Sequence, residues 1–196
     1  FLLACGRVAA GTAAFPEGIV DLDFSSPGFL FLLNGFDPSS PLEARAMVRE
    51  AFEISERHRV PVILRPTTRV CHSRQPVPID LTKLAPRPAK FVKEPGRWAA
   101  TPRFRLELHR ELNAKLDALR REFEASTFNS GEGGGPLGII AAGHAWAVVR
   151  DVLAEEGRQV PVLKIGTPYP LPVDRVMRFI DRCQKVLVLE EPDHAI

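Results

Sequence analysis

The spacing of hydrophobic residues is most regular from residue 137 onward. Apolar runs at 137–142, 160–165 and 186–190 alternate with two segments predicted to be helices, 145–155 and 173–183. Continuous apolar runs are typical of strands covered on both faces of a parallel sheet. In the second helix we expect an inward face of Val176, Phe179 and Ile180. This alternation predicts an α/β fold, with a parallel sheet, right-handed crossovers and flanking helices.

The first part of the chain contains one sharply marked helix. Ser40 before Pro41, with Glu43 soon after, is a helix start, and the helix is expected to run to His58. Short strands are expected within 18–23 and 29–33, and a buried strand at 60–64. The helix residues predicted to be buried are Ala44, Met47, Val48, Ala51, Phe52 and Ile54.

A proline-rich stretch from 75 to 102 divides the chain, because such a composition is typical of an extended linker. We therefore predict a first domain at 1–74, a linker at 75–102 and a second domain at 103–196. A long amphipathic helix is expected from about Pro102 to Thr127, with its charged residues as a solvated face. Its predicted apolar stripe consists of Leu106, Leu108, Leu112, Leu116, Leu119 and Phe123.

The composition of the chain argues against some classes of function. The 196 residues are 45% hydrophobic and 26% charged with a net charge of +2, which is typical of a globular protein and too weak a charge for nucleic-acid binding. No apolar run is long enough for a membrane span. Three widely separated cysteines and no metal-ligand spacing indicate free thiols in a reducing cytoplasm. Because the chain opens with Phe1 and no basic segment, we expect a piece of a longer protein.

Candidate chemistry lies where the predicted strands end, since ligands gather at the carboxyl ends of parallel strands. Arg69, His72 and Ser73 follow the strand at 60–64 and suit acid/base or anion-binding roles, or packing at the domain boundary. His144 suits a helix cap, and Tyr169 a structural or interfacial role. Glu190 and Glu191 are candidate acid/base groups or partners of a neighbouring subunit's arginine, but adjacent strand residues face opposite ways and form no dyad.

A glycine cluster at 131–135 invites a phosphate-loop interpretation. It precedes a strand instead of joining a strand to a helix, and it has no GK[ST] ending. We therefore do not expect it to hold a phosphate.

Three spaced motifs carry a resemblance to a known family. The run EAFEISE at 50–56 leads to the segment RPTTRVCHS at 65–73, followed later by LKIG at 163–166 with YPLP at 169–172, and by VLEE at 188–191. In this order they resemble the alpha subunit of indolepyruvate:ferredoxin oxidoreductase. The resemblance covers roughly residues 39 to 193.

The resemblance implies an enzyme that decarboxylates an aryl pyruvate on thiamine diphosphate and Mg²⁺. Electrons pass through iron–sulfur clusters to ferredoxin, and coenzyme A takes the acyl group. It also implies the tail of a pyrimidine-binding domain, then a transketolase C-terminal-like domain, in an oligomer with the remaining domains or subunits. The family's GDG motif and cluster cysteines are absent from this sequence.

We therefore expect the chain alone to be inactive, to hold none of these cofactors and to act mainly as architecture. Arg69, His72 and Ser73 are the residues expected to contact substrate, coenzyme or a partner domain. The alternative is a non-catalytic transketolase C-terminal-like module that docks a separate catalytic subunit.

Overall fold

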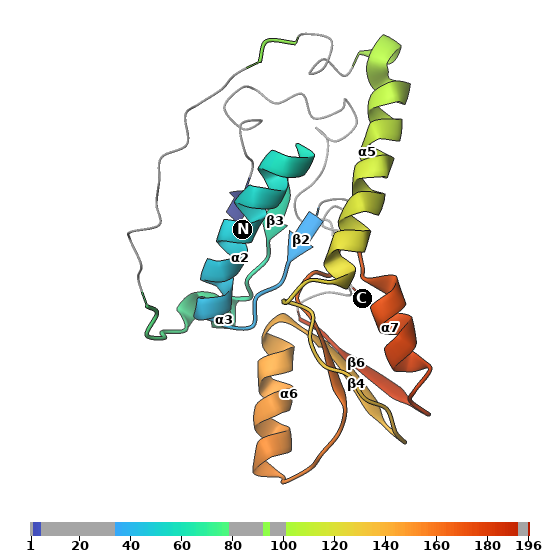
Figure 1. Cartoon of the computed structure of the whole chain (residues 1–196). Coiled ribbons are helices and arrows are strands. Elements are labelled where there is room, and N and C mark those ends of the chain that lie inside the picture. The colour runs from blue at the N-terminus through green and yellow to red at the C-terminus, as the bar shows by residue number, and fades with distance from the viewer. Residues whose placement is uncertain (1, 5–33, 79–91, 95–100, 192–195) are drawn as a thin grey trace.

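The computed structural model describes residues 2–4, 34–78, 92–94, 101–191 and 196 (Figure 1). The strands expected within 18–23 and 29–33, and most of the predicted linker, lie outside these ranges. The described elements are, in chain order, β1 (Leu2–Ala4), β2 (Asn34–Phe36), α2 (Pro41–His58), β3 (Val62–Leu64), α3 (Thr68–His72), α5 (Pro102–Glu124), β4 (Gly138–Ala142), α6 (Gly143–Glu155), β5 (Val162–Ile165), α7 (Val173–Ile180) and β6 (Val186–Leu189).

The described strands form two three-stranded sheets. In the first, with the order β1-β3-β2, β2 runs parallel to β3 and β1 runs antiparallel to it. In the second, with the order β5-β4-β6, all strands are parallel. The predicted α/β class with parallel strands and flanking helices is confirmed, and the antiparallel β1 is an addition that the residue pattern did not predict.

The second sheet is covered on both faces (Figure 1). Adjacent residues of β4 point to opposite sides, so Ile139 packs with Val149 of α6 while Ile140 packs with Val176 and Phe179 of α7. The chain steps from β4 to β5 through α6, and returns past β4 to β6 through α7. Helices on opposite faces are what two right-handed crossovers in opposite directions require.

Helix α2 has the start that the sequence predicted. Pro41 is its first residue, and the hydroxyl of the N-cap Ser40 accepts a hydrogen bond from the Glu43 amide at 3.2 Å. Met47, Ala51 and Ile54 are buried against β2 and β3. Phe52 was predicted to be buried too, but it is 48% exposed because it lies one position off this stripe.

Helix α5 joins the same core from its middle onward, where Leu112 packs against the core and Leu119 and Phe123 are buried in it. Phe123 stacks at 5.9 Å between ring centroids against Phe36 of β2, and Leu119 is fully buried. Leu106, predicted for the same stripe, is 63% exposed, which is a wrong prediction for the first turns of the helix. The inward position predicted for Ile180 is also wrong, because α7 ends there and the side chain is exposed.

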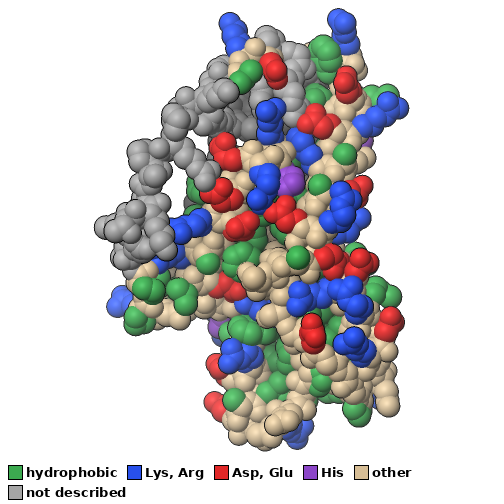
Figure 2. Space-filling view, in the orientation of Figure 1, with side chains coloured by type: hydrophobic (Ala, Val, Ile, Leu, Met, Phe, Trp, Pro, Cys, Tyr) green, Lys and Arg blue, Asp and Glu red, His purple; other side chains and the backbone are tan. Residues whose placement is uncertain are grey.

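Charge is spread over the visible surface without a large patch of one sign (Figure 2). Acidic and basic side chains alternate along α5, the longest helix described, as expected for a solvated face. Within the described residues, no helix combines the length and the apolarity needed to cross a bilayer.

Candidate functional site

The carboxyl ends of the two sheets meet. Asp37 follows β2, and its amide donates to the carbonyl of Gly166, which follows β5, at 2.9 Å. The Asp37 carboxylate lies against Gly143, where a side-chain carbon would fall 2.7 Å from Oδ1. We call this contact between the strand ends the junction. Ligands of parallel sheets gather at the carboxyl ends of the strands, and here the carboxyl ends of both sheets lie at the junction.

A buried ion pair occupies the first side of the junction. The Arg65 guanidinium, just after β3, donates to Asp37 Oδ2 at 2.8 Å, and both side chains are almost fully buried. Asp37 Oδ1 has no hydrogen-bond partner among the described residues. Burial raises the pKa of Asp37 to about 6, against the opposing effect of the Arg65 charge, and the charges of Glu190 and Glu43 add to the rise.

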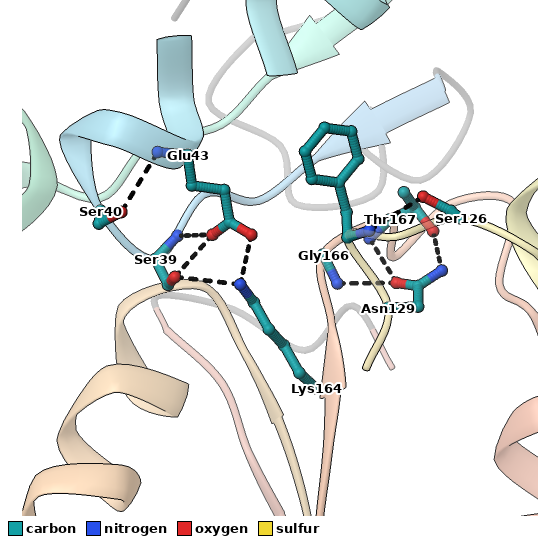
Figure 3. Close-up of polar contacts among 9 residues, drawn as sticks. Ser39, Ser40, Glu43, Ser126, Asn129, Lys164, Gly166 and Thr167 are labelled. Carbon is teal, nitrogen blue, oxygen red and sulfur yellow. Dashed lines mark hydrogen bonds and ion pairs between the residues drawn. The ribbon is translucent and has the colours of Figure 1, made fainter. Parts of the chain in front are cut away.

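A second ion pair links β5 of the second sheet to α2, which packs on the first sheet (Figure 3). Lys164 of β5 is 5% exposed, and its Nζ donates to the carboxylate of Glu43 in α2 and, at 3.1 Å, to the hydroxyl of Ser39. Ser39 in turn donates from its amide and its hydroxyl to Glu43 at 2.7 and 2.6 Å. The Lys164 ammonium also lies 4.2 Å from the ring centroid of Trp146 in α6.

A buried amide links α5 to the end of β5. Asn129 Oδ1 accepts from the amides of Gly166 and Thr167 at 2.9 and 3.1 Å (Figure 3). Its Nδ2 donates to the carbonyl of Phe123 and to the Thr167 hydroxyl at 2.9 and 2.7 Å. All four hydrogen bonds of this side chain are therefore made inside the protein.

Of the three predicted site residues, Arg69 and His72 lie on α3 and Ser73 caps its end. Arg69 is exposed, and its Nε lies 3.7 Å from Glu191 just beyond β6. The pairing of Glu190 or Glu191 with an arginine of a neighbouring subunit stays a prediction. The Ser73 hydroxyl donates to the Arg69 carbonyl at 2.6 Å and completes the end of α3. His72 is exposed. The structure thus brings Arg69 to the second sheet and uses Ser73 within its own turn.

The other sequence candidates have structural roles within the described residues. The carbonyl of Tyr169 accepts from the Gly35 amide at 2.9 Å, which ties the 166–172 segment to β2. Helix α6 begins at Gly143, so His144 lies in its first turn. No group of three His, Cys, Asp or Glu side chains in the described parts of the chain is arranged to hold a metal ion.

Asp37, Glu43, Lys164 and Asn129 were not among the sequence candidates. One signal was present for Lys164, since a lysine inside the apolar strand Val162–Ile165 needs a buried partner. The others have no local pattern that separates them from surface polar residues.

The glycine cluster packs against protein. Ser130 and Lys164 exchange backbone hydrogen bonds at 2.7 and 3.2 Å, and the Gly135 amide donates to the Arg182 carbonyl. A side-chain carbon on Gly134 would lie 2.4 Å from that carbonyl. Gly131 and Gly134 are thus packed against backbone, whereas Gly135 has open space where a side chain would point.

Replacing Gly131 with alanine is expected to destabilise the fold strongly. Its φ is +101°, and the added carbon would lie 1.9 Å from the Val162 carbonyl oxygen. We expect a loss of about 3 kcal/mol in the free energy of unfolding, measured by urea titration, from backbone strain plus overpacking. Gly157→Ala is the matched control, because Gly157 has φ +60° but open space around it, and should lose only about 1 kcal/mol. Equal losses would show that packing against β5 is unimportant.

Several known proteins are similar to this chain over most of its length. No family model matches it. Over 160 residues it is 38% identical to indolepyruvate oxidoreductase subunit IorA of Methanothermobacter thermautotrophicus, which covers 80% of this chain and 26% of that protein. IorA of Pyrococcus abyssi is 39% identical over 163 residues (79% and 25%), and IorA of Archaeoglobus fulgidus 32% over 161 residues (80% and 26%). The chain thus spans about a quarter of the length of these curated relatives.

A solved structure has a similar fold. It is a 2-oxoglutarate:ferredoxin oxidoreductase from Magnetococcus marinus with 2-oxoglutarate, coenzyme A and succinyl-CoA bound. The TM-score is 0.54 at 18% sequence identity, and the match covers 79% of this chain and 34% of that one. At this identity the similarity concerns the fold alone.

Proposed function

This chain is a relative of the IorA subunits of indolepyruvate oxidoreductases, and from that premise we propose that it forms one segment of a thiamine diphosphate-dependent 2-oxoacid:ferredoxin oxidoreductase. The whole enzyme would oxidatively decarboxylate an aryl pyruvate and form an acyl-coenzyme A. Its other domains or subunits, and ferredoxin, would be the partners of this segment. Support comes from sequence identity of 32–39% over about four-fifths of the chain.

In this proposal the chain holds two parts of the enzyme. Residues 1–74 would be the tail of a pyrimidine-binding domain, 75–102 a linker, and 103–196 a transketolase C-terminal-like domain. The separation of the described strands into two sheets, one before residue 65 and one after residue 137, supports this division.

The cofactors belong to the whole enzyme. When bound there, thiamine diphosphate would stabilise the carbanion left by decarboxylation, and iron–sulfur clusters would carry the electrons. Gly131 and Gly134 pack against the backbone of β5 and of Arg182, which supports the proposal that the diphosphate is held by another part of the enzyme. In this proposal the role of the chain is mainly architectural, and the junction is the place where it would meet the ligands of the enzyme.

Arg69 is the residue best suited to meet an anion at the junction. Its side chain is 67% exposed, and its Nε lies 3.7 Å from Glu191, whose side chain is 42% exposed. An ion pair this exposed contributes little to stability and is easily exchanged. A planar guanidinium matches the carboxylate of a 2-oxoacid or a phosphate of coenzyme A. His72 and Ser73 follow it on the same rim.

Arg69→Gln in the full-length enzyme that carries this segment is expected to raise the KM for one of the anionic ligands about tenfold, from the loss of a charge-assisted hydrogen bond. Steady-state kinetics with phenylpyruvate and coenzyme A varied in turn would identify which ligand. Arg74→Gln is the matched control, because Arg74 is an exposed arginine five residues further on, outside α3. Its KM values should stay unchanged.

Two outcomes would contradict the proposal. If the full-length protein oxidises no 2-oxoacid with ferredoxin as acceptor, the enzyme assignment is wrong and the docking-module alternative gains support. If the enzyme is active and both arginine variants behave like the parent, Arg69 has no role in ligand binding.

A further inference from the structure

The start of α3 follows directly on Arg65. Between Arg65 and the first residue of α3, Thr68, the chain has only Pro66 and Thr67, and Thr67 is buried as the N-cap. The Arg65 amide donates to the Phe36 carbonyl at 2.8 Å, and its guanidinium binds Asp37. Val70 within α3 is buried as well. The ion pair with Asp37 is therefore one of the contacts that fix where α3 begins.

Asp37 itself contacts the end of β5 and the start of α6. Its amide binds the Gly166 carbonyl, and its carboxylate touches the first residue of α6. Asp37 thus contacts both Arg65, which leads into α3, and Gly143, which begins α6.

We infer that Asp37 is a positioning residue: through Arg65 it holds α3, and with it Arg69, against the ends of the second sheet, and protonation of its carboxyl group releases that hold. The identity of the ligand that Arg69 binds rests on the proposed function, whereas the positioning of α3 by Asp37 does not.

The charges around Asp37 support a release near neutral pH. Arg65 favours the ionised carboxylate, and Glu43 and Glu190 oppose it from α2 and from beyond β6. Lys164 of β5 is engaged with Glu43, and His144 is the titratable residue in the first turn of α6. Burial is the largest influence, and it places the pKa of Asp37 at about 6 instead of 3.8.

The sign of the effect follows from this shift. Above pH 6 Asp37 is ionised and pairs with Arg65, so α3 is held. As the pH falls through 6 the folded protein takes up a proton and the ion pair is lost. The folded state is not weakened by this protonation, because a raised carboxyl pKa means that proton uptake between about pH 3.8 and 6 favours the folded chain. A local release of α3 without unfolding is the expected result.

Cys71 gives a direct probe, because it is exposed on α3. In a Cys5→Ser/Cys183→Ala background it would be labelled with a trifluoromethyl group and followed by ¹⁹F NMR from pH 5 to 8. His72 is adjacent to the label, so the background also carries His72→Gln, which removes the imidazole from the surroundings of the probe. We expect a change in chemical shift with a midpoint near the Asp37 pKa of about 6, and the loss of this change on adding Asp37→Asn. Circular dichroism should stay constant over the same range.

The outcomes are distinguishable. A transition that persists in Asp37→Asn, or no transition in the background itself, would overturn the inference. If Asp37→Asn does not fold, Arg65→Met serves instead: its ¹⁹F signal should stay at the low-pH position throughout, and a remaining transition would overturn the inference. None of these results depends on a ligand, so they stand or fall separately from the kinetic test of Arg69.

Discussion

Lys164→Met is expected to lower the free energy of unfolding by about 3–5 kcal/mol, the usual cost of removing one partner of a buried ion pair. Methionine keeps most of the length of the lysine stem but lacks the ammonium that lies 4.2 Å from the ring centroid of Trp146. What is lost is the cation that neutralises Glu43, whose side chain is only 14% exposed. Urea unfolding at pH 7 measures the loss.

Two further variants separate the ion pair from general damage to β5. Glu43→Gln added to Lys164→Met removes the stranded charge and should recover about half of the loss. Arg120→Met is the control, because Arg120 pairs with Asp117 at 3.2 Å on α5 with both side chains exposed, and it should lose at most about 0.5 kcal/mol. If Lys164→Met were as mild as this control, the contact between α2 and β5 would not hold the two sheet systems together.

Local signals in the sequence predicted most of the described elements. Ser40, Pro41 and Glu43 determine the start of α2 through groups a few residues apart, so the prediction needed no tertiary information. Phe52 is exposed because it lies one position off the buried stripe of α2, whereas the errors at Leu106 and Ile180 have a common cause at helix ends. Apolar spacing indicates which face of a helix can be buried, whereas burial at a helix end depends on whether another element reaches it.

The candidate site was predicted in part. The rule that ligands gather at strand ends led to Arg69, His72 and Ser73, and α3 does follow β3. The rule could not show that the two sheets face each other end to end. Asp37 and Gly143 are over a hundred residues apart in the chain and touch only because of that arrangement.

The same limit applies to Asn129. In sequence it stands beside Ser130 and the glycine cluster, in a stretch that predicts a loop. In the structure it is 2% exposed and binds the backbone at the end of β5 and of α5. A polar residue in a loop pattern cannot be separated from a buried one, because the partners that make burial favourable are distant in sequence.

Asn129→Leu should therefore be among the most damaging single changes, with an expected loss of about 3–5 kcal/mol. Leucine has the same branching as asparagine but a larger volume, and it leaves the amides of Gly166 and Thr167 and the Phe123 carbonyl buried without partners. Each unpaired group costs about 1–3 kcal/mol.

Asn113→Leu, the same change at an exposed position of α5, should lose less than about 0.5 kcal/mol. Urea unfolding of both variants decides the matter: a loss below about 1 kcal/mol at Asn129 would mean that water replaces the missing hydrogen bonds and that this site is not closed. A large loss confined to Asn129 would show that the end of β5, and so the junction it forms with Asp37, is held in place from α5.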